Sequence, residues 1–370
     1  MAHEAHSAPT GPLAGLRVVE FASIGPGPFA CMLLSDLGAE VVRIDRPDAR
    51  LGDRLDIVGR GRRTVLLDLK RKGDVDQALE LLADADALVE GLRPGVMERL
   101  GLGPEVVAER NPRLVYGRMT GWGQQGPLAH AAGHDINYIS IAGALAAIGE
   151  EGRVPVPPLN LVGDYGGGSL YLVVGILAAV LEARSSGKGQ VVDAAICDGA
   201  VSLMTLFQMQ SLRGTHTERR GSNLLDGGAP FYSVYETADG GHVSVGPIEP
   251  KFFAMLCEKV GIPPELHDAQ HDRSRWKALR QAMAACFRTR TRAQWCEMLE
   301  GTDACFAPVL PLSEAASHPH LRSRGAFVDV EGVPHTAPAP RFSRTPATIQ
   351  GPAPSRAVAV DDVLQAWRAA

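Results

Sequence analysis

Residues 16–45 read LRVVEFASIGPGPFACMLLSDLGAEVVRID, and this stretch predicts the fold of the chain. Its first part, 16–22, is rich in β-branched residues, as a buried strand should be. The apolar spacing of 28–39 is that of a helix ending at a glycine, and 40–45 predicts a second strand. Two strands joined through a helix form the repeating unit of a parallel sheet.

This alternation of strand and helix continues through the first half of the chain. Further strands are predicted over 62–69, 87–91 and 113–119, and a further helix over 74–85. We therefore expect an α/β protein in which a parallel, doubly wound sheet carries helices on both faces.

The second half predicts a smaller α+β domain. Residues 231–247 alternate polar and apolar residues around Asp239–Gly240–Gly241, a strong hairpin signal. A strand is expected at 191–196, and helical segments are expected at 169–184, 198–214, 251–260 and 274–300.

These patterns suggest where the domains lie. We place the large domain over 11–195 and expect about 325–370 to complete it. A linker helix and loop would cover 196–229, and the small α+β domain 230–320.

Composition limits the classes of function. The chain has 370 residues, of which 45% are hydrophobic and 21% charged, with a net charge of −5. A mildly acidic balance argues against binding nucleic acid through overall charge. The cysteines are scattered and form no CxxC pair, so we expect free thiols in a reducing compartment and no metal site.

Targeting and membrane signals are weak. Residues 1–10 lack the basic start and apolar core of a signal peptide. The longest apolar run, 170–181, is too short to span a bilayer. We therefore expect a cytoplasmic protein without a membrane partner.

One cofactor signal competes with other interpretations. Gly25–Pro26–Gly27–Pro28–Phe29–Ala30 fits GxGxxA after a predicted strand, and Asp45 ends the next strand, as in a dinucleotide-binding fingerprint. Against a nicotinamide enzyme, the two prolines remove backbone N–H groups from the loop that should hold the pyrophosphate. A tight strand-to-helix turn is the plainer interpretation.

Two segments suggest proton-transfer chemistry. AGHDINYIS (132–140) offers His134 beside a glycine, and LNLVGDYGGGSLY (159–171) offers Asp164 just before three glycines. A histidine and an aspartate that face one substrate atom are what a racemase needs. Each also has a structural alternative, since an isolated histidine is often structural and Asp164 is well suited to cap the helix that follows.

Five segments together resemble the α-methylacyl-CoA racemase branch of the family III (CaiB/BaiF) CoA transferases. The similarity extends from about residue 11 to PAPRFSRTP at 338–346. The segments are GPLAGLRVVEFASIGPGPFACMLLSDLGAEVVRIDRP, GLRPGVMERLGLGP, GRMTGWGQQGP, AGHDINYIS and PPLNLVGDYGGGS.

The resemblance implies a Rossmann-like CoA-binding domain, a small domain and an interlocked homodimer with each active site between protomers. It implies an acyl-CoA substrate, a place in lipid metabolism such as that of branched-chain fatty acids, and no cofactor apart from the CoA of the substrate. His134 and Asp164 match the catalytic pair, and Glu249 matches the carboxylate that pairs with the histidine. CoA contacts are implied for Arg46, Leu67, Asp68, Leu69, Lys70, Gly91, Leu92, Arg93, Arg99, Gly133, Asp135, Ile136, Asn137 and Tyr138.

The expected reaction is racemisation at the α-carbon of a 2-methylacyl-CoA. A base removes the α-proton to give an enolate, and an acid returns a proton on the other face. Backbone N–H groups at the helix start beside Asp164 would stabilise the enolate oxygen. Glu249 would orient the imidazole of His134, although its assignment rests mainly on the resemblance.

Two alternatives stay open at this point. In a family III acyl-CoA:carboxylate CoA transferase, Asp164 would be a nucleophile that forms an anhydride with the acyl group. His134 separates the two activities, since only racemisation requires a base there and transferases usually carry an aromatic residue. A non-enzymatic CoA-binding or scaffold protein is disfavoured, because all three candidate catalytic residues are present. Arg93 and Arg99 have a simpler alternative as surface charges.

Overall fold

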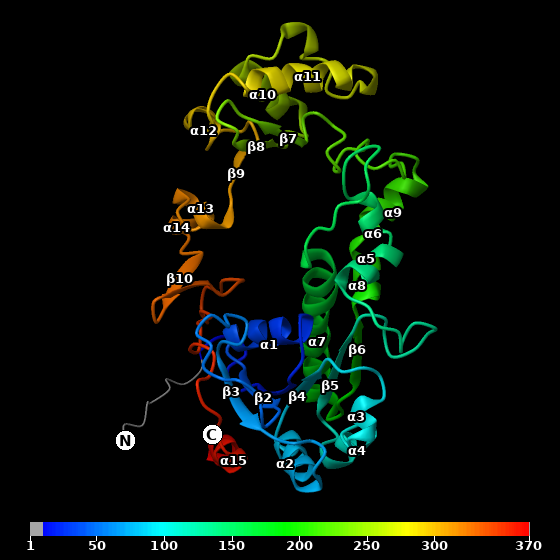
Figure 1. Ribbon diagram of the computed structural model, residues 1–370, viewed down its shortest axis with the longest axis vertical. Helices are drawn as coiled ribbons and strands as arrows, with labels where there is room; N and C mark the ends of the chain where they lie inside the picture. Colours follow the sequence, from blue (N-terminus) through cyan, green and yellow to red (C-terminus); the bar gives the residue numbers. More distant parts are fainter. Residues whose placement is uncertain (1–9, 370) are drawn as a thin grey trace. The chain divides into compact units, whose positions relative to one another are not determined.

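A computed structural model describes residues 10–369, which fall into two units (Figure 1). The first unit contains the described residues up to Ala142, then Leu159–Met204 and the segment from Arg324 onward. The second contains Gly143–Pro158 and Thr205–Ser323. The expected linker, 196–229, is divided between the two units, because its first residues pack with the large sheet.

The first unit is built on a six-stranded sheet in the order β3-β2-β1-β4-β5-β6. Every neighbouring pair is parallel, which confirms the predicted doubly wound class. The strand order reverses between β1 and β4, so the loops after these two strands open a crevice at the carboxyl edge of the sheet. The strands are β1 (Arg17–Phe21), β2 (Glu40–Asp45), β3 (Arg62–Leu66), β4 (Ala87–Glu90), β5 (Val115–Thr120) and β6 (Val191–Ala195).

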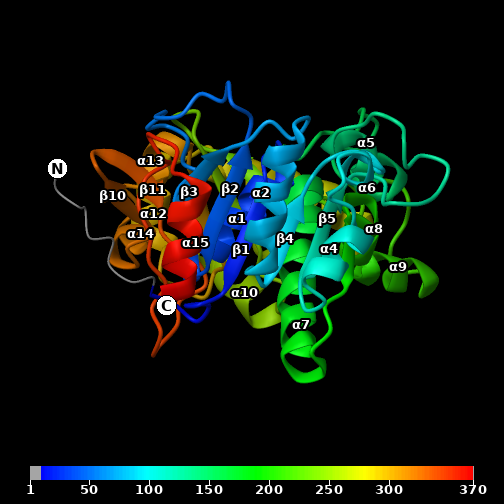
Figure 2. The ribbon, with the colours of Figure 1, turned by 90° about the horizontal axis from the view of Figure 1, so that it is seen from below.

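Helices cover both faces of this sheet. One face packs against α1 (Pro26–Asp36) and α7 (Leu170–Ser186), and the other against α2 (Lys72–Ala83), α4 (Pro104–Arg110) and α15 (Val360–Ala369). Figure 2 shows α2 and α15 on the same side of the strands. The first unit also contains α3 (Val96–Arg99), α5 (Asp135–Ile141), the π-helix η1 (Leu161–Ser169), α8 (Ile196–Leu203), β10 (Phe327–Val330) and β11 (Val333–Thr336).

The second unit contains a three-stranded antiparallel sheet in the order β7-β8-β9. The predicted hairpin is present, with β7 (Ser233–Glu236) paired to β8 (His242–Val245). The helical stretch expected at 274–300 is two helices, because Thr291 caps a new one through its side chain. The remaining elements are α6 (Ala144–Ala147), α9 (Thr205–Leu212), α10 (Pro250–Val260), η2 (Pro264–Leu266), η3 (Arg273–Arg275), α11 (Trp276–Phe287), α12 (Arg292–Leu299), β9 (Phe306–Val309), α13 (Leu312–Ala315) and α14 (Pro319–Ser323).

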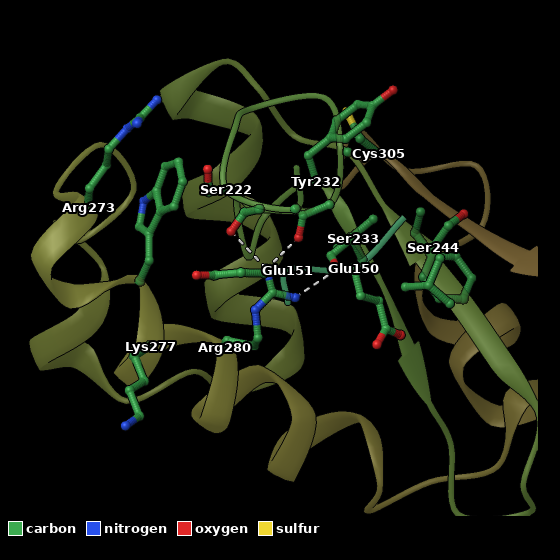
Figure 3. A pocket seen from close by; sticks show the side chains of 18 of the residues that line it. Glu150, Glu151, Ser222, Tyr232, Ser233, Ser244, Arg273, Lys277, Arg280 and Cys305 are labelled. Atoms are coloured by element: carbon green, nitrogen blue, oxygen red, sulfur yellow. Dashed lines mark hydrogen bonds between the residues drawn. The ribbon is translucent and has the colours of Figure 1, made fainter. Parts of the chain in front are cut away.

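This unit also holds a cavity of about 1440 Å³ (Figure 3). Its wall includes Tyr232, Cys305 and the guanidinium group of Arg280. Arg280 donates hydrogen bonds to the carbonyl oxygens of Gly227 (2.5 Å) and Gly228 (2.8 Å) and to the hydroxyl of Ser233 (2.9 Å). The side chain of Arg280 therefore connects the loop at Gly227 and Gly228 to Ser233 in β7.

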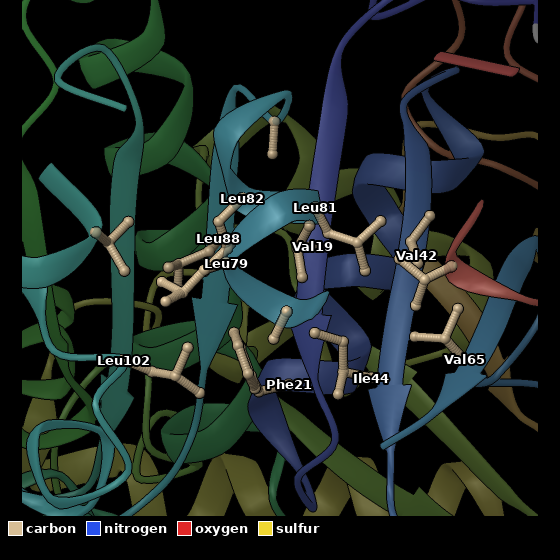
Figure 4. Close-up of a cluster of buried hydrophobic side chains, with 14 of the residues drawn as sticks. Val19, Phe21, Val42, Ile44, Val65, Leu79, Leu81, Leu82, Leu88 and Leu102 are labelled. Carbon is tan, nitrogen blue, oxygen red and sulfur yellow. The ribbon is translucent and has the colours of Figure 1, made fainter. Parts of the chain in front are cut away.

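The core of the first unit follows from the alternation of side chains along its strands. Val18 packs on the α1 and α7 face, whereas Val19 packs on the face of α2 and α15. Figure 4 shows the cluster on the α2 and α15 face, which contains Leu81 of α2 and Val42 of β2. Buried charge pairs interrupt the apolar sheet interior: the guanidinium Nε of Arg62 donates to Glu20 at 2.5 Å, and that of Arg118 to Glu90 at 2.9 Å.

The apolar segment after Asp164 differs from the prediction. A continuous helix runs over Leu161–Ser186, as η1 followed by α7, although the sequence predicted a start at 169. Glycines allow this, since a Cβ on Gly167 would lie 2.8 Å from the backbone nitrogen of Ala200 in α8. This helix has 26 residues, and its most apolar 18-residue stretch has a mean hydropathy of 1.7, so by length and composition alone it could cross a membrane, but half of that stretch is buried within the protein.

Candidate active site

The loops after β1 and β4 come into close contact at the point where the strand order reverses. Ser23 follows β1 and Gly91 follows β4, and a Cβ on Gly91 would lie 2.8 Å from the Ser23 hydroxyl. That hydroxyl oxygen is buried, and it has no hydrogen-bond partner within the part of the chain that the structure describes. The two loops therefore meet where a parallel α/β sheet ordinarily binds its ligand.

His134 lies at this edge of the sheet, at the start of a helix. It is the N-cap residue of α5, and its extended backbone is held because its N–H donates to the side-chain oxygen of Asn137 at 3.0 Å. The preceding Gly133 is held too, since its carbonyl accepts a hydrogen bond from the hydroxyl of Tyr138. Tyr138 in turn packs edge-on against Trp122, with ring centroids 4.7 Å apart. Both sides of the histidine are thus fixed by α5 itself.

Asp164 lies in the first turn of η1, and its half-buried carboxyl group has a raised pKa. Burial is the main cause, because it disfavours the charged form. A 3.4 Å hydrogen bond from Asn160 lowers this pKa, the charge of Asp135 raises it, and His134 lowers it. Asp135, which accepts a hydrogen bond from the N–H of Asp164, directly follows His134, so the structure brings the two segments that carry the predicted pair together.

The glycine-rich loop that suggested a dinucleotide site packs against η1. A Cβ on Gly25 would lie 3.2 Å from Oδ2 of Asp164, and the rings of Phe29 and Tyr165 stack with centroids 4.2 Å apart. Asp45, the acidic residue of the fingerprint, forms an ion pair with Arg43 at 2.7 Å. These contacts agree with the turn interpretation of the GxGxxA segment.

The backbone donors beside Asp164 differ from the expectation. Its own N–H donates to Oδ1 of Asp135 at 2.8 Å, and the N–H of Tyr165 donates to the carbonyl of Asn160 at 3.2 Å. These two groups are therefore occupied and do not form the expected oxyanion site. The physical reason is that the helix starts before Asp164, so Tyr165 already has a helical acceptor.

Four exposed cations lie near the carboxyl edge of the sheet. Arg46 follows β2, Lys70 follows β3, and Arg93 and Arg99 follow β4. The side chain of Arg46 is 80% exposed, with Asp48 3.7 Å away. Burial and the charge of Asp164 raise the pKa of Tyr138, and the charge of Arg93 lowers it. The positive charges at this edge suit a ligand that carries phosphate groups, as CoA does.

The other residues implied as CoA contacts have varied surroundings. Leu67 is buried in the core, and Asp68, Leu69, Gly91 and Leu92 lie in the loops after β3 and β4. Hydrogen bonds to other groups of the protein engage the side chains of Asp135, Asn137 and Tyr138. The side chain of Ile136 is exposed. Contact of these residues with CoA stays a prediction.

Glu249 lies in the second unit, as the N-cap residue of α10, where its carbonyl accepts from the N–H groups of Phe252 and Phe253 at 3.0 Å. Its pairing with His134 stays a prediction. Over residues 10–369, no group of three or more histidine, cysteine, aspartate or glutamate side chains is arranged to hold a metal ion.

Two neighbours of Asp164 were not predicted. Asn160 had no signal, because the sequence predicts no helix before 169 and therefore no helical relation between positions 160 and 164. Gly25 had none, since only the fold brings the loop after β1 to the carboxyl group.

Comparisons with known proteins agree with this geometry. The model of CoA-transferase family III matches residues 13–357. The α-methylacyl-CoA racemase of Mus musculus is 45% identical and that of Homo sapiens 42%, each over 90% of this chain and 87% of the relative. A crystal structure of a CaiB/BaiF family protein from Brucella suis superimposes with a TM-score of 0.82 at 24% identity, covering 96% of this chain and 99% of the other, which is a likeness of fold.

Proposed function

Because the chain belongs to CoA-transferase family III, we propose that it is an α-methylacyl-CoA racemase, an isomerase that interconverts (R)- and (S)-2-methylacyl-CoA. The observation that carries the proposal is the 2.8 Å hydrogen bond from the N–H of Asp164 to Asp135, the residue directly after His134. The identity to two mammalian racemases supports racemisation over CoA transfer.

The proposed reaction is a pair of proton transfers at the α-carbon. One residue takes the α-proton as a base, the thioester becomes an enolate, and the other residue gives a proton to the opposite face. One direction starts from neutral His134 and protonated Asp164, and the reverse direction from protonated His134 and ionised Asp164. The raised pKa of Asp164 brings the acidity of its carboxyl group closer to that of an imidazole, which favours exchange both ways.

Substrate binding is proposed at the exposed cations. Arg46, Lys70, Arg93 and Arg99 would hold the phosphates of CoA, because guanidinium and ammonium groups donate hydrogen bonds to phosphate oxygens. No cofactor is required, since CoA is part of the substrate and both proton transfers use side chains. The six free cysteines fit the reducing cytoplasm, the proposed location.

A homodimer is part of the proposal. An apolar surface on α7 and α8 is exposed on the single chain, and two of its members, Val174 and Leu181, are 66% and 68% exposed. Exposed apolar area of this kind marks an interaction site, and a second copy of this chain is the occupant that we propose. The surface consists of Leu170, Val174, Leu181, Val201 and Leu203.

The proposed site is shared between protomers, as the resemblance to the family implies. In this arrangement Glu249 of one protomer would orient His134 of the other and stabilise the charged imidazole. We would co-express Asp164→Asn and Glu249→Gln chains with different tags and purify the mixed dimer. A shared site predicts that one of its two sites is intact and active. An inactive mixed dimer would place Glu249 with the His134 of its own chain, and parental activity in the Glu249→Gln homodimer would place Glu249 outside the mechanism.

Deuterium exchange tests the function directly. We would incubate (R)- and (S)-2-methylacyl-CoA separately with the protein in D₂O and follow the α-carbon by NMR. The proposal predicts deuterium at the α-carbon and convergence of both isomers to one mixture. Absence of exchange together with CoA transfer to an added carboxylic acid would instead identify a transferase with Asp164 as the nucleophile.

A further inference from the structure

The two segments that carry the proton-transfer residues are joined by a hydrogen bond. Asp135 is the first residue of α5, directly after His134, and its Oδ1 accepts the N–H of Asp164 at 2.8 Å. N–H groups in the first turn of a helix lack an acceptor within the helix. The carboxylate at the start of one helix therefore satisfies a donor in the first turn of the other.

The surroundings of this bridge leave its carboxylate little freedom. Oδ1 of Asp135 lies so close to Gly163 that a Cβ at that position would overlap it, and the same Cβ would lie 3.0 Å from a methyl carbon of Ile139. Glycine at 163 thus makes room for the side chain of Asp135. Contacts within α5 and η1 therefore set the position of Asp135.

The charge of Asp135 also acts on Asp164. Burial is the largest cause that raises the pKa of Asp164, and the nearby negative charge of Asp135 raises it further. The hydrogen bond from Asn160 and the charge of His134 act in the opposite direction. Asp135 therefore favours the protonated carboxylic acid, which is the form that donates a proton.

We propose that Asp135 is a positioning residue of the acid–base pair: its carboxylate holds the backbone of Asp164 opposite His134 and keeps a negative charge beside it. This inference rests on the proposed function and deepens it. The CoA contact that the family resemblance implies for Asp135 stays a separate prediction.

Two substitutions separate the hydrogen bond from the charge. In Asp135→Asn the amide oxygen still accepts the N–H of Asp164, but the charge is lost. We expect an unchanged KM for 2-methylacyl-CoA. In the reaction direction that uses Asp164 as the base, we expect the acidic limb of the pH profile of kcat to move to lower pH. In Asp135→Ala the bridge is lost as well, and kcat falls on the order of 10- to 100-fold.

Glu105→Gln is the matched control, because Glu105 is an exposed carboxylate in the first turn of α4. We expect its kcat, KM and pH profile to equal those of the parent. If Asp135→Asn raises KM and leaves the pH profile in place, Asp135 is a CoA contact and the proposal is wrong. Parent-like profiles in both Asp135 variants would also overturn it.

A measurement without turnover keeps this inference separate from the proposed function. The side-chain carboxyl carbon of Asp164, assigned through Asp164→Asn, is titrated by ¹³C NMR in the parent and in Asp135→Asn. We expect its pKa to be lower in the variant. An unchanged titration overturns the positioning role even if the protein racemises its substrate. A shifted titration without any α-proton exchange in the parent would leave the bridge intact and overturn the proposed function.

Discussion

Gly25 and Asp164 are neighbours in the folded chain, and a Cβ on Gly25 would lie only 3.2 Å from Oδ2 of the aspartate. Gly25 precedes α1 at the switch point of the sheet, and Asp164 lies in η1. The contact explains why a glycine-rich loop follows β1 in a protein that we propose to be a racemase. Because glycine has no side chain, Gly25 makes room for the carboxyl group of Asp164.

Gly25→Ala is expected to lower both stability and activity. The φ of Gly25 is 78°, a region that alanine adopts only with strain of about 1–3 kcal/mol. The added methyl group would also press on Asp164, so kcat should fall together with the melting temperature. Gly187→Ala is the control, since its φ is 75° and no atom lies within 4 Å of its Cβ position. It should lower the melting temperature and leave kcat unchanged.

His134→Gln is expected to reduce racemisation by about 10²- to 10⁴-fold, the usual contribution of a general acid–base group. The glutamine retains the size and polarity of the side chain but does not take up the α-proton. Chiral chromatography of the acyl-CoA isomers measures the rate. His130→Gln, an exposed histidine in the same segment, should keep parental activity. Equal rates in the parent and His134→Gln would remove His134 from the mechanism.

Asp164→Asn is expected to stabilise the fold at neutral pH while it abolishes racemisation. Folding raises the pKa of Asp164 above its unfolded value of about 3.8, because the half-buried carboxyl group favours the protonated form. The contribution of Asp164 to the stability of the fold is therefore fully present below the unfolded pKa. It is lost as pH rises through the folded pKa and the carboxyl group becomes charged. The melting-temperature difference between variant and parent should therefore grow from acidic to neutral pH. Asp76→Asn, on an exposed position of α2, controls for the loss of one charge. A difference that is independent of pH would contradict this assignment.

Arg62→Ala is expected to destabilise the first unit by about 3–5 kcal/mol, because it leaves the buried carboxylate of Glu20 without its partner. Urea unfolding measures the loss. Arg63→Ala, one residue along the same strand, removes a partly exposed pair with Glu40 and should cost at most about 1 kcal/mol. Similar losses in both variants would show that burial of the pair does not matter.

Gly163→Ala is expected to lower kcat without changing any charge. The new methyl group would displace the carboxylate of Asp135 from the N–H of Asp164. Gly73→Ala in α2 is the control, because no atom lies within 4 Å of its Cβ position, and it should leave kcat unchanged. A parental kcat in Gly163→Ala would show that the bridge can be displaced without consequence.

Much of the fold could be predicted from local pattern. The parallel class followed from strands such as 16–22 and 40–45, because β-branched runs separated by a helical period have few other solutions. The start of η1 could not be predicted, since Gly166, Gly167 and Gly168 read as a helix breaker. They are helical because close contact with α8 outweighs their poor propensity.

The sequence by itself determined the chemistry available, because the identities of His134 and Asp164 limit what the site can do, and their neighbouring motifs point to a family. Only the tertiary structure decided which groups meet. The hydrogen bond from Asp164 to Asp135, the contact with Gly25 and the cations near the sheet edge join segments that are far apart along the chain. Local periodicity carries no information on such pairs, since they depend on the order in which the parallel strands assemble.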